Sequence, residues 1–155
     1  MVDRKDVGSW IEGPRAARAG EGTYPGQRLG LPEHGPGSVA RFGRRLVAIL
    51  IDWTLSQLVA VALLGGEFGR GGAGGLLPLA VFFAENVLLV GTVGFTVGHR
   101  IMGLRVVRLG GAPAGPVPGL VRSLLLAIAV PALIWDKDER GLHDKAAGTV
   151  IIRTR

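Results

Sequence analysis

Three long apolar runs, at residues 46–64, 76–97 and 120–135, separate the polar segments of this chain. Apolar residues cluster within each run instead of alternating regularly with polar ones, which favours helices surrounded by lipid. At 1.5 Å per residue, the first two runs reach about 28 Å and about 33 Å, enough to cross a hydrocarbon core of about 30 Å. We therefore predict two transmembrane helices, at 46–64 and 76–97.

The third run is too short for a simple crossing. As a helix it would be about 24 Å long, and it contains Arg122 and Pro131. Either the bilayer thins and Arg122 snorkels, or the segment enters and leaves on the same side. Two β-like stretches, 104–109 and 149–153, flank the run, and pairing between them would place both on one side of the membrane. We therefore expect a third, short membrane-embedded helix that does not fully cross.

The distribution of charge sets the expected orientation. Three arginines lie immediately before the first run and three lie between the second and third runs, whereas the 65–75 loop holds one glutamate and one arginine; the six are Arg41, Arg44, Arg45, Arg100, Arg105 and Arg108. Because arginine and lysine gather in cytoplasmic loops, this pattern predicts a cytoplasmic N-terminus and a multi-pass topology.

Composition agrees with a membrane protein. The chain is 48% hydrophobic and 19% charged, with a mean hydropathy of +0.37 and a formal net charge of +6. The basic residues flank the apolar runs, so we expect them to meet a lipid bilayer and not nucleic acid. The absence of cysteine excludes disulfides, thiolate metal ligands and cysteine nucleophiles.

Residues 1–37 differ from the rest of the chain. They are rich in glycine and proline and have few apolar residues, so they bury too little surface to offset the entropy of ordering. We predict a disordered cytoplasmic tail at 1–37 and a membrane domain at 38–155.

Asp52 lies inside the first apolar run. An aspartate at the centre of a membrane helix costs about 2.5–3.5 kcal/mol, so we expect it to face protein or water. Arg45 shares its helix face but lies two turns away, about 10 Å along the axis, too far for an ion pair. Arg122 is the partner that we consider first. Asp52 then either fixes helix packing or binds a proton or cation.

Glu85 is a second acid within an apolar run. If Asp52 and Glu85 lie together, nearby polar side chains would add oxygen atoms of the kind that a hard cation prefers; these side chains are Thr54, Ser56, Gln57 and Asn86. The two acids are therefore a candidate ion or proton site.

Enzyme chemistry lacks support in the sequence. The pair His143–Asp144 is similar to the sites of metal-dependent phosphohydrolases, but His34 and His99 are the other histidines available, too few for such a centre. We read residues 141–149 as a helix and turn, and no serine lies in a nucleophile motif. We expect no enzymatic activity, metal or cofactor.

Four sequence blocks together resemble a known family: RRLVAILID (44–52), FTVGHRIMGLRVVRLGG (95–111), LVRS (120–123) and RGLHDKAAGTVII (140–152). They are similar, in this order, to the RDD family of small bacterial integral membrane proteins. In the resemblance, Arg45, Asp52 and Asp144 match the arginine and two aspartates that give the family its name. His99 departs from it, since relatives often carry lysine there. The resemblance implies a bacterial inner membrane, and transport, with cation/proton antiport proposed for some members.

We therefore expect an all-α membrane protein with a small cytoplasmic β-pair. The leading hypothesis is transport of a small cation or proton, with Asp52 as the intramembrane acid, Arg45 or Arg122 tuning its charge and Asp144 ordering the C-terminal tail. Because two helices enclose little space, we expect a homo-oligomer or another membrane subunit, with contacts at Gly91, Gly94 and Gly98. The competing hypothesis is a scaffold or accessory subunit that transports nothing.

Overall fold

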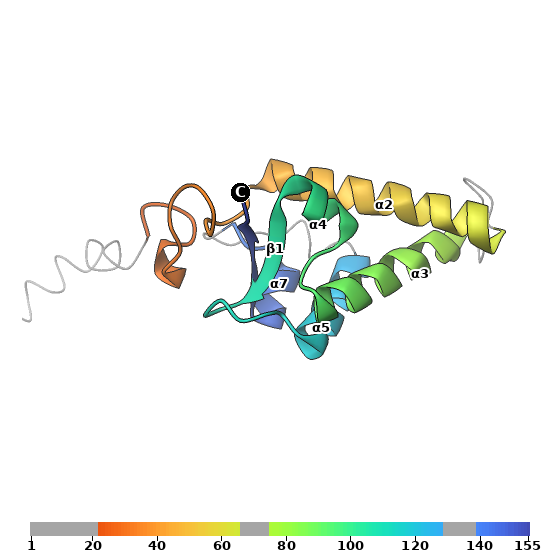
Figure 1. The fold of residues 1–155 in the computed structure, drawn as a ribbon. Coiled ribbons are helices and arrows are strands. Elements are labelled where there is room, and N and C mark those ends of the chain that lie inside the picture. Colours follow the sequence, from red (N-terminus) through yellow and green to blue (C-terminus); the bar gives the residue numbers. More distant parts are fainter. Residues whose placement is uncertain (1–21, 66–74, 129–138) are drawn as a thin grey trace, which may run out of the picture.

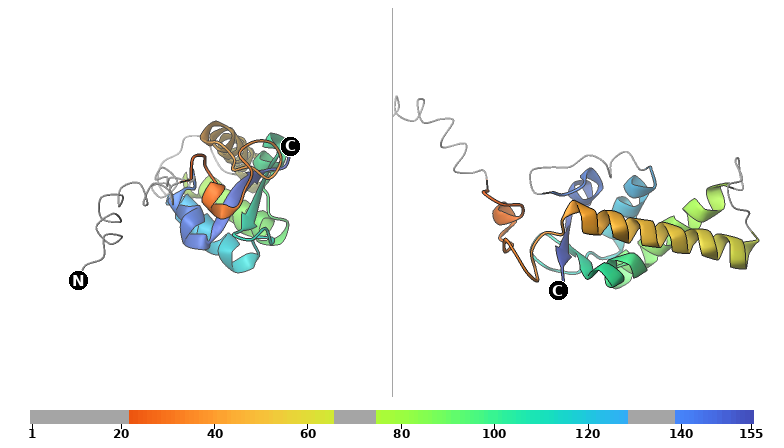
Figure 2. Two further views of the ribbon diagram at one scale, coloured as in Figure 1. Left: turned by 90° about the vertical axis from the view of Figure 1, so that its left-hand side faces the viewer. Right: turned by 90° about the horizontal axis from the view of Figure 1, so that it is seen from above.

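A helical hairpin dominates the computed structural model, which describes residues 22–65, 75–128 and 139–155 (Figure 1). Helix α2 (Phe42–Leu64) packs on α3 (Leu76–Glu85), which continues into a π-helical turn, η3 (Asn86–Val90). The hairpin projects away from the strands in the views of Figures 1 and 2. Among the described residues, α2 is the one helix long and apolar enough to cross a membrane. It begins four residues before the predicted run and ends, as predicted, at Leu64.

The second predicted span is interrupted. Asn86 donates a side-chain hydrogen bond to Phe82 O (3.0 Å), at the start of the π-turn. Gly94 then adopts a left-handed backbone (φ 82°), and Val97 begins a separate helix, α4 (Val97–Met102). The apolar helix therefore covers Leu76–Val90, about 22 Å, and the expected crossing over 76–97 is not found.

A small antiparallel sheet lies at the other end of the molecule. Strand β1 (Leu104–Arg108) pairs with β2 (Thr149–Arg153), which confirms the predicted β-pair. Residues just before α2 run along β2, where Ala40 N donates to Ile151 O (2.8 Å). The start of α2 and both strands therefore lie together.

In the described part of the chain between the strands, residues 109–128 and 139–148, lie two further helices. Helix α5 (Pro116–Ala127) begins four residues before the third apolar run, and α7 (Leu142–Ala147) forms the predicted helix and turn before β2. A Cβ on Gly119 would lie 2.8 Å from Gly91 Cα, so glycine at both positions lets α5 approach the hairpin. The rest of the predicted third helix, residues 129–135, lies outside the described residues.

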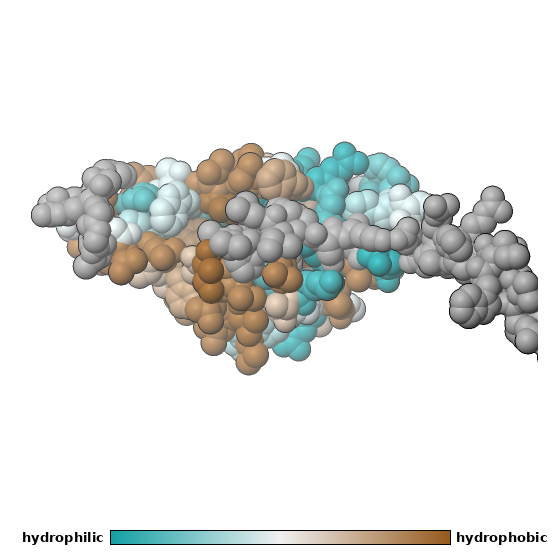
Figure 3. All heavy atoms as spheres, turned by 180° about the vertical axis from the view of Figure 1, so that it is seen from behind, coloured by the Kyte–Doolittle hydropathy of each residue, from teal (hydrophilic) through white to brown (hydrophobic). Residues whose placement is uncertain are grey.

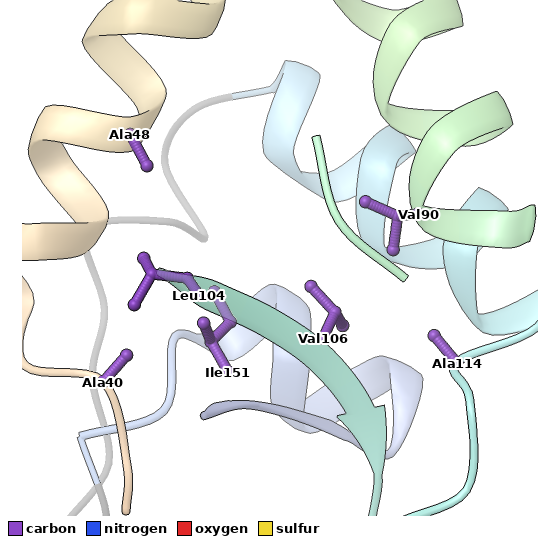
Figure 4. Packing of buried hydrophobic residues seen from close by; sticks show 7 residues of the cluster. All are labelled: Ala40, Ala48, Val90, Leu104, Val106, Ala114 and Ile151. Atoms are coloured by element: carbon purple, nitrogen blue, oxygen red, sulfur yellow. The ribbon is translucent and has the colours of Figure 1, made fainter. Parts of the chain in front are cut away.

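The hydrophobic core joins the hairpin to the sheet. Figure 4 shows Leu104, Val106 and Ile151 from the strands between Ala48 of α2 and Val90 of η3, together with Ala40 and Ala114. On the face in Figure 3, hydrophobic residues gather over the helices and hydrophilic ones toward the strands. Side chains such as Leu50 and Leu63 of α2 are exposed, as a helix in contact with lipid requires.

The N-terminal segment is more ordered than the sequence predicted. Residues 22–37 include a short 3-10 helix, η1 (Gln27–Leu29), and Leu29 and Leu31 pack on a second cluster formed by Val39, Val107 and Val150. The prediction of a disordered tail over 1–37 is therefore not confirmed for residues 22–37, where two partly buried leucines pack against the sheet. Residues 1–21 lie outside the described residues.

Candidate functional site

The carboxylate of Asp52 is buried, with 1% of the residue exposed, between α2 and α4. Its Oδ2 accepts a hydrogen bond from Thr96 Oγ1 (2.5 Å), and its Oδ1 accepts one from the main-chain N–H of Gly98 (2.6 Å). Only glycine fits at position 98, because a Cβ there would lie 2.1 Å from Ala48 O. Both of these donors come from the start of α4, which packs directly against α2.

Thr96 caps α4 and links Asp52 to His99. The Thr96 side chain accepts from His99 N (3.2 Å), and His99 Nδ1 lies 2.6 Å from Thr96 Oγ1. Burial lowers the pKa of His99 to about 3, and the charges of Arg122 and Arg45 add to this effect while Asp144 opposes it. His99 is therefore a neutral imidazole at physiological pH.

Glu85 reaches Asp52 from the opposite helix of the hairpin. The two side chains are in hydrogen-bonding contact. Ser56 Oγ lies 3.5 Å from Glu85 Oε2 and donates to the main-chain oxygen of Asp52 (2.8 Å). Glu85 Oε1 is buried, and no N–H or hydroxyl group of the described residues donates to it in normal hydrogen-bond geometry. The structure thus brings together the two acids that the sequence singled out.

A groove of about 420 Å³ borders this pair on the hairpin. Its walls are mostly aliphatic, and its polar lining residues are Ser56 and Glu85; the others are Leu55, Val59, Val81, Leu89 and Val97. Glu85 is thus the carboxyl group of the pair that borders the groove, whereas the carboxylate of Asp52 is enclosed by α4.

Asp144 forms a second buried polar cluster, near the sheet. Its Oδ2 lies 2.5 Å from Arg45 Nη2, and its Oδ1 lies 2.6 Å from Arg122 Nε. Thr149 Oγ1 donates to Oδ1 (3.2 Å), and His143 Nε2 lies 3.3 Å from Oδ2. The carboxylate thereby joins the first turns of α2, the middle of α5 and the start of β2 to α7.

Opposite charges decide the ionisation of Asp144, which is completely buried. Burial alone would raise the pKa of this carboxyl group, but Arg122, His143 and Arg45 outweigh burial and hold the pKa well below its usual range. Asp144 is therefore an anion at any physiological pH, and it neutralises buried arginine charge.

The arginines are distributed differently from the sequence-based expectation. Arg122, considered first as the partner of Asp52, forms its ion pair with Asp144 and acts on Asp52 only through longer-range electrostatics. Arg45 and Asp52 do not pair within the helix, as their spacing predicts. Arg45 instead binds Asp144, ninety-nine residues along the chain.

Several polar residues and glycines make contacts that differ from those expected from the sequence. Of the four polar residues near the acids in sequence, Ser56 reaches them, whereas Thr54 is exposed and donates to Leu50 O. Gly91, Gly94 and Gly98, expected at an oligomer contact, pack instead against residues of this same chain.

Sequence reasoning missed Thr96 and Thr149, and it assigned Gly98 to helix contacts and not to the binding of Asp52. The segment from Thr96 to His99 has the spacing of a capping box, with histidine in place of glutamate or glutamine, so the start of α4 is detectable. That Thr96 also binds a side chain forty-four residues earlier has no local signal.

The comparison with protein families gives one match. The sequence model of the RDD family matches residues 39–148. No match was found among curated proteins or among solved structures. The match begins one residue after the predicted start of the membrane domain at 38.

Proposed function

This chain belongs to the RDD family, a family of membrane domains, and on that premise we propose that it transports a proton or small cation by way of Asp52 and Glu85. The observation that carries the proposal is the contact between these carboxyl groups, one from each helix of an apolar hairpin. Each buried acid in such a setting is costly, by about 2.5–3.5 kcal/mol at mid-membrane. Acids retained at that cost mark ion or proton pathways by default.

The proposed topology has both ends of the domain in the cytoplasm of a bacterial cell, with the hairpin inserted in the inner membrane. Pairing of β1 with β2, and of residue 40 with β2, supports one common side for these segments. The exposed arginines at this end, including Arg41, Arg100 and Arg105, support the cytoplasmic side. In this arrangement residues 120–135 enter and leave on the same side.

Transport is tested with purified protein in proteoliposomes under an imposed pH gradient, with sodium or potassium on the opposite side. We expect Asp52→Asn to abolish proton movement. Glu33→Gln, which changes an exposed acid near the N-terminal segment, serves as the matched control. Normal flux in the Asp52→Asn protein, with circular dichroism unchanged, would overturn the proposal.

A scaffold role is the second candidate. It is favoured by the hydrogen bonds of Asp52 to Thr96 and Gly98, which fix α4 on α2. In that case Asp52→Asn would lower stability, Glu85→Gln would not, and neither protein nor wild type would move protons above the leak of empty liposomes.

A single hairpin encloses little space, so the transport proposal includes assembly into a homo-oligomer or with another membrane subunit. Cross-linking in native membranes followed by mass measurement tests this part. Transport by vesicles that each contain one copy of the protein would contradict the proposal that transport requires assembly.

A further inference from the structure

We propose that the Asp52–Glu85 pair holds one proton, carried by Glu85 and shared with an ionised Asp52, and that this proton, and not a metal cation, is the species bound at the site. The inference deepens the proposed function and rests on it for the role of the site in transport. Its geometry stands independently, on the contacts of the two carboxyl groups.

A proton on one of the two carboxyl groups makes the contact between them favourable. An ionised carboxylate only accepts hydrogen bonds, so two carboxylates cannot bond to each other. Asp52 and Glu85 are in hydrogen-bonding contact in a largely apolar surrounding, where two like charges would repel strongly. One proton converts this repulsion into an O–H···O⁻ hydrogen bond, which is among the stronger kinds.

The donors around the pair show which group is ionised. Asp52 receives two short hydrogen bonds, from Thr96 Oγ1 (2.5 Å) and Gly98 N (2.6 Å), and such donors favour the carboxylate form. Glu85 interacts with two donors, the main-chain N–H of Val97 and the Ser56 hydroxyl at 3.5 Å, and its buried Oε1 accepts from no N–H or hydroxyl group in good geometry. A proton on Glu85 supplies the donor that the contact with Asp52 lacks.

The same donors leave little for a metal cation. Hard cations take about six oxygen ligands, as calcium and magnesium do. Here Gly98 N and the Thr96 hydroxyl each take one of the two acceptor sites on an oxygen of Asp52, and the groove adds one hydroxyl, of Ser56, to its aliphatic walls. Within the described parts of the chain, no three His, Asp or Glu side chains are grouped as a metal site.

The charges facing the pair agree with a single proton. His99 on α4 is neutral, Arg122 on α5 acts at longer range, and Asp144 on α7 binds both Arg122 and Arg45 and contacts His143. Arg45 and Arg122 form their ion pairs with Asp144 and not with Asp52 or Glu85. A doubly ionised Asp52–Glu85 pair would therefore lack a directly bound arginine.

Infrared spectroscopy of the full-length protein in lipid vesicles tests this directly, because a protonated carboxyl group has a C=O absorption distinct from that of a carboxylate. At pH 7 we expect one such band that disappears in Glu85→Gln and persists in Glu33→Gln. Exchange of choline chloride for sodium chloride at equal concentration should leave it unchanged. Absence of the band in wild type, or its loss in sodium, would overturn the inference.

A second pair of variants keeps the test valid if Glu85→Gln does not fold. Ser56→Ala removes the hydroxyl near Glu85 and should shift the band, whereas Thr54→Ala, on the same helix but facing outward, should not. An equal response of the band to both variants would overturn the assignment to Glu85. A band without proton flux would overturn the transport proposal alone, whereas sodium transport without a band would overturn this inference alone.

Discussion

Loss of the Asp144 carboxylate should be the most destabilising single change in the polar end of the molecule. Asp144→Asn keeps the shape of the side chain but removes the charge that neutralises Arg45 and Arg122, both almost completely buried. Removing one partner of a buried ion pair typically costs about 3–5 kcal/mol, because the other charge remains buried without compensation. With two arginines affected, we expect a loss near the upper end, about 5 kcal/mol, or more than a thousandfold in the folding equilibrium.

Equilibrium unfolding of the full-length protein in detergent micelles, followed by circular dichroism, measures this loss. The exposed control Glu33→Gln should change the free energy of unfolding by less than about 0.5 kcal/mol. In the double variant, Arg122→Met removes one of the two orphaned cations, so the double variant should be more stable than Asp144→Asn alone. A cost below about 1 kcal/mol for Asp144→Asn, or no recovery in the double variant, would refute the role of Asp144 as the neutralising anion.

Three further predictions concern α4 and are measured by the same unfolding assay. Gly98→Ala should lower the free energy of unfolding by at least about 1–3 kcal/mol, since its Cβ would lie 2.1 Å from Ala48 O. Gly43→Ala, with open space around the added Cβ, should not destabilise the protein. Equal effects of the two substitutions would contradict the close approach of α4 to α2. Thr96→Val should cost about 1–3 kcal/mol by removing a donor from buried Asp52, a loss that a well-folded variant of wild-type stability would disprove. Because the pKa of His99 is about 3 in the folded protein and about 6.5 in the unfolded chain, its contribution to stability is complete above pH 6.5 and is lost as the pH falls toward 3. The free energy of unfolding should fall by about 2 kcal/mol by pH 5, and His99→Gln should flatten this pH dependence relative to wild type. Parallel curves for the two proteins would show that His99 is not buried in its neutral form.

The sequence predicts most accurately the features that depend on local pattern. Residues 46–64 form one predominantly apolar stretch, so the core of α2 and its end before Gly65 follow from the pattern alone. The β-pair follows from two short β-like stretches of similar length, and α7 from its flanking glycines. The RDD resemblance, drawn from four separated blocks, agrees with the family match over residues 39–148.

Features that depend on distant contacts are predicted less well. Apolar residues continue through Gly94, so hydropathy cannot reveal that the helix stops there and that Thr96 starts another. The sequence does not show whether Arg122 neutralises Asp52 or Asp144. Arg122 pairs with Asp144 because α5, which carries Arg122, packs on α7, which carries Asp144. The pairing of Asp52 with Glu85 was expected only on the assumption that the two helices face each other and that both residues lie at the same height along the hairpin.

Proton flux through the Glu85→Gln protein tests the central claim most directly, because Glu85 is the acid that borders the groove and has few structural hydrogen bonds to lose. The measurement is the initial rate of internal pH change in proteoliposomes after a pH jump, at matched protein density. We predict flux at the level of empty liposomes for Glu85→Gln and wild-type flux for Thr54→Ala and Glu33→Gln. Wild-type flux through a folded Glu85→Gln protein would contradict the account.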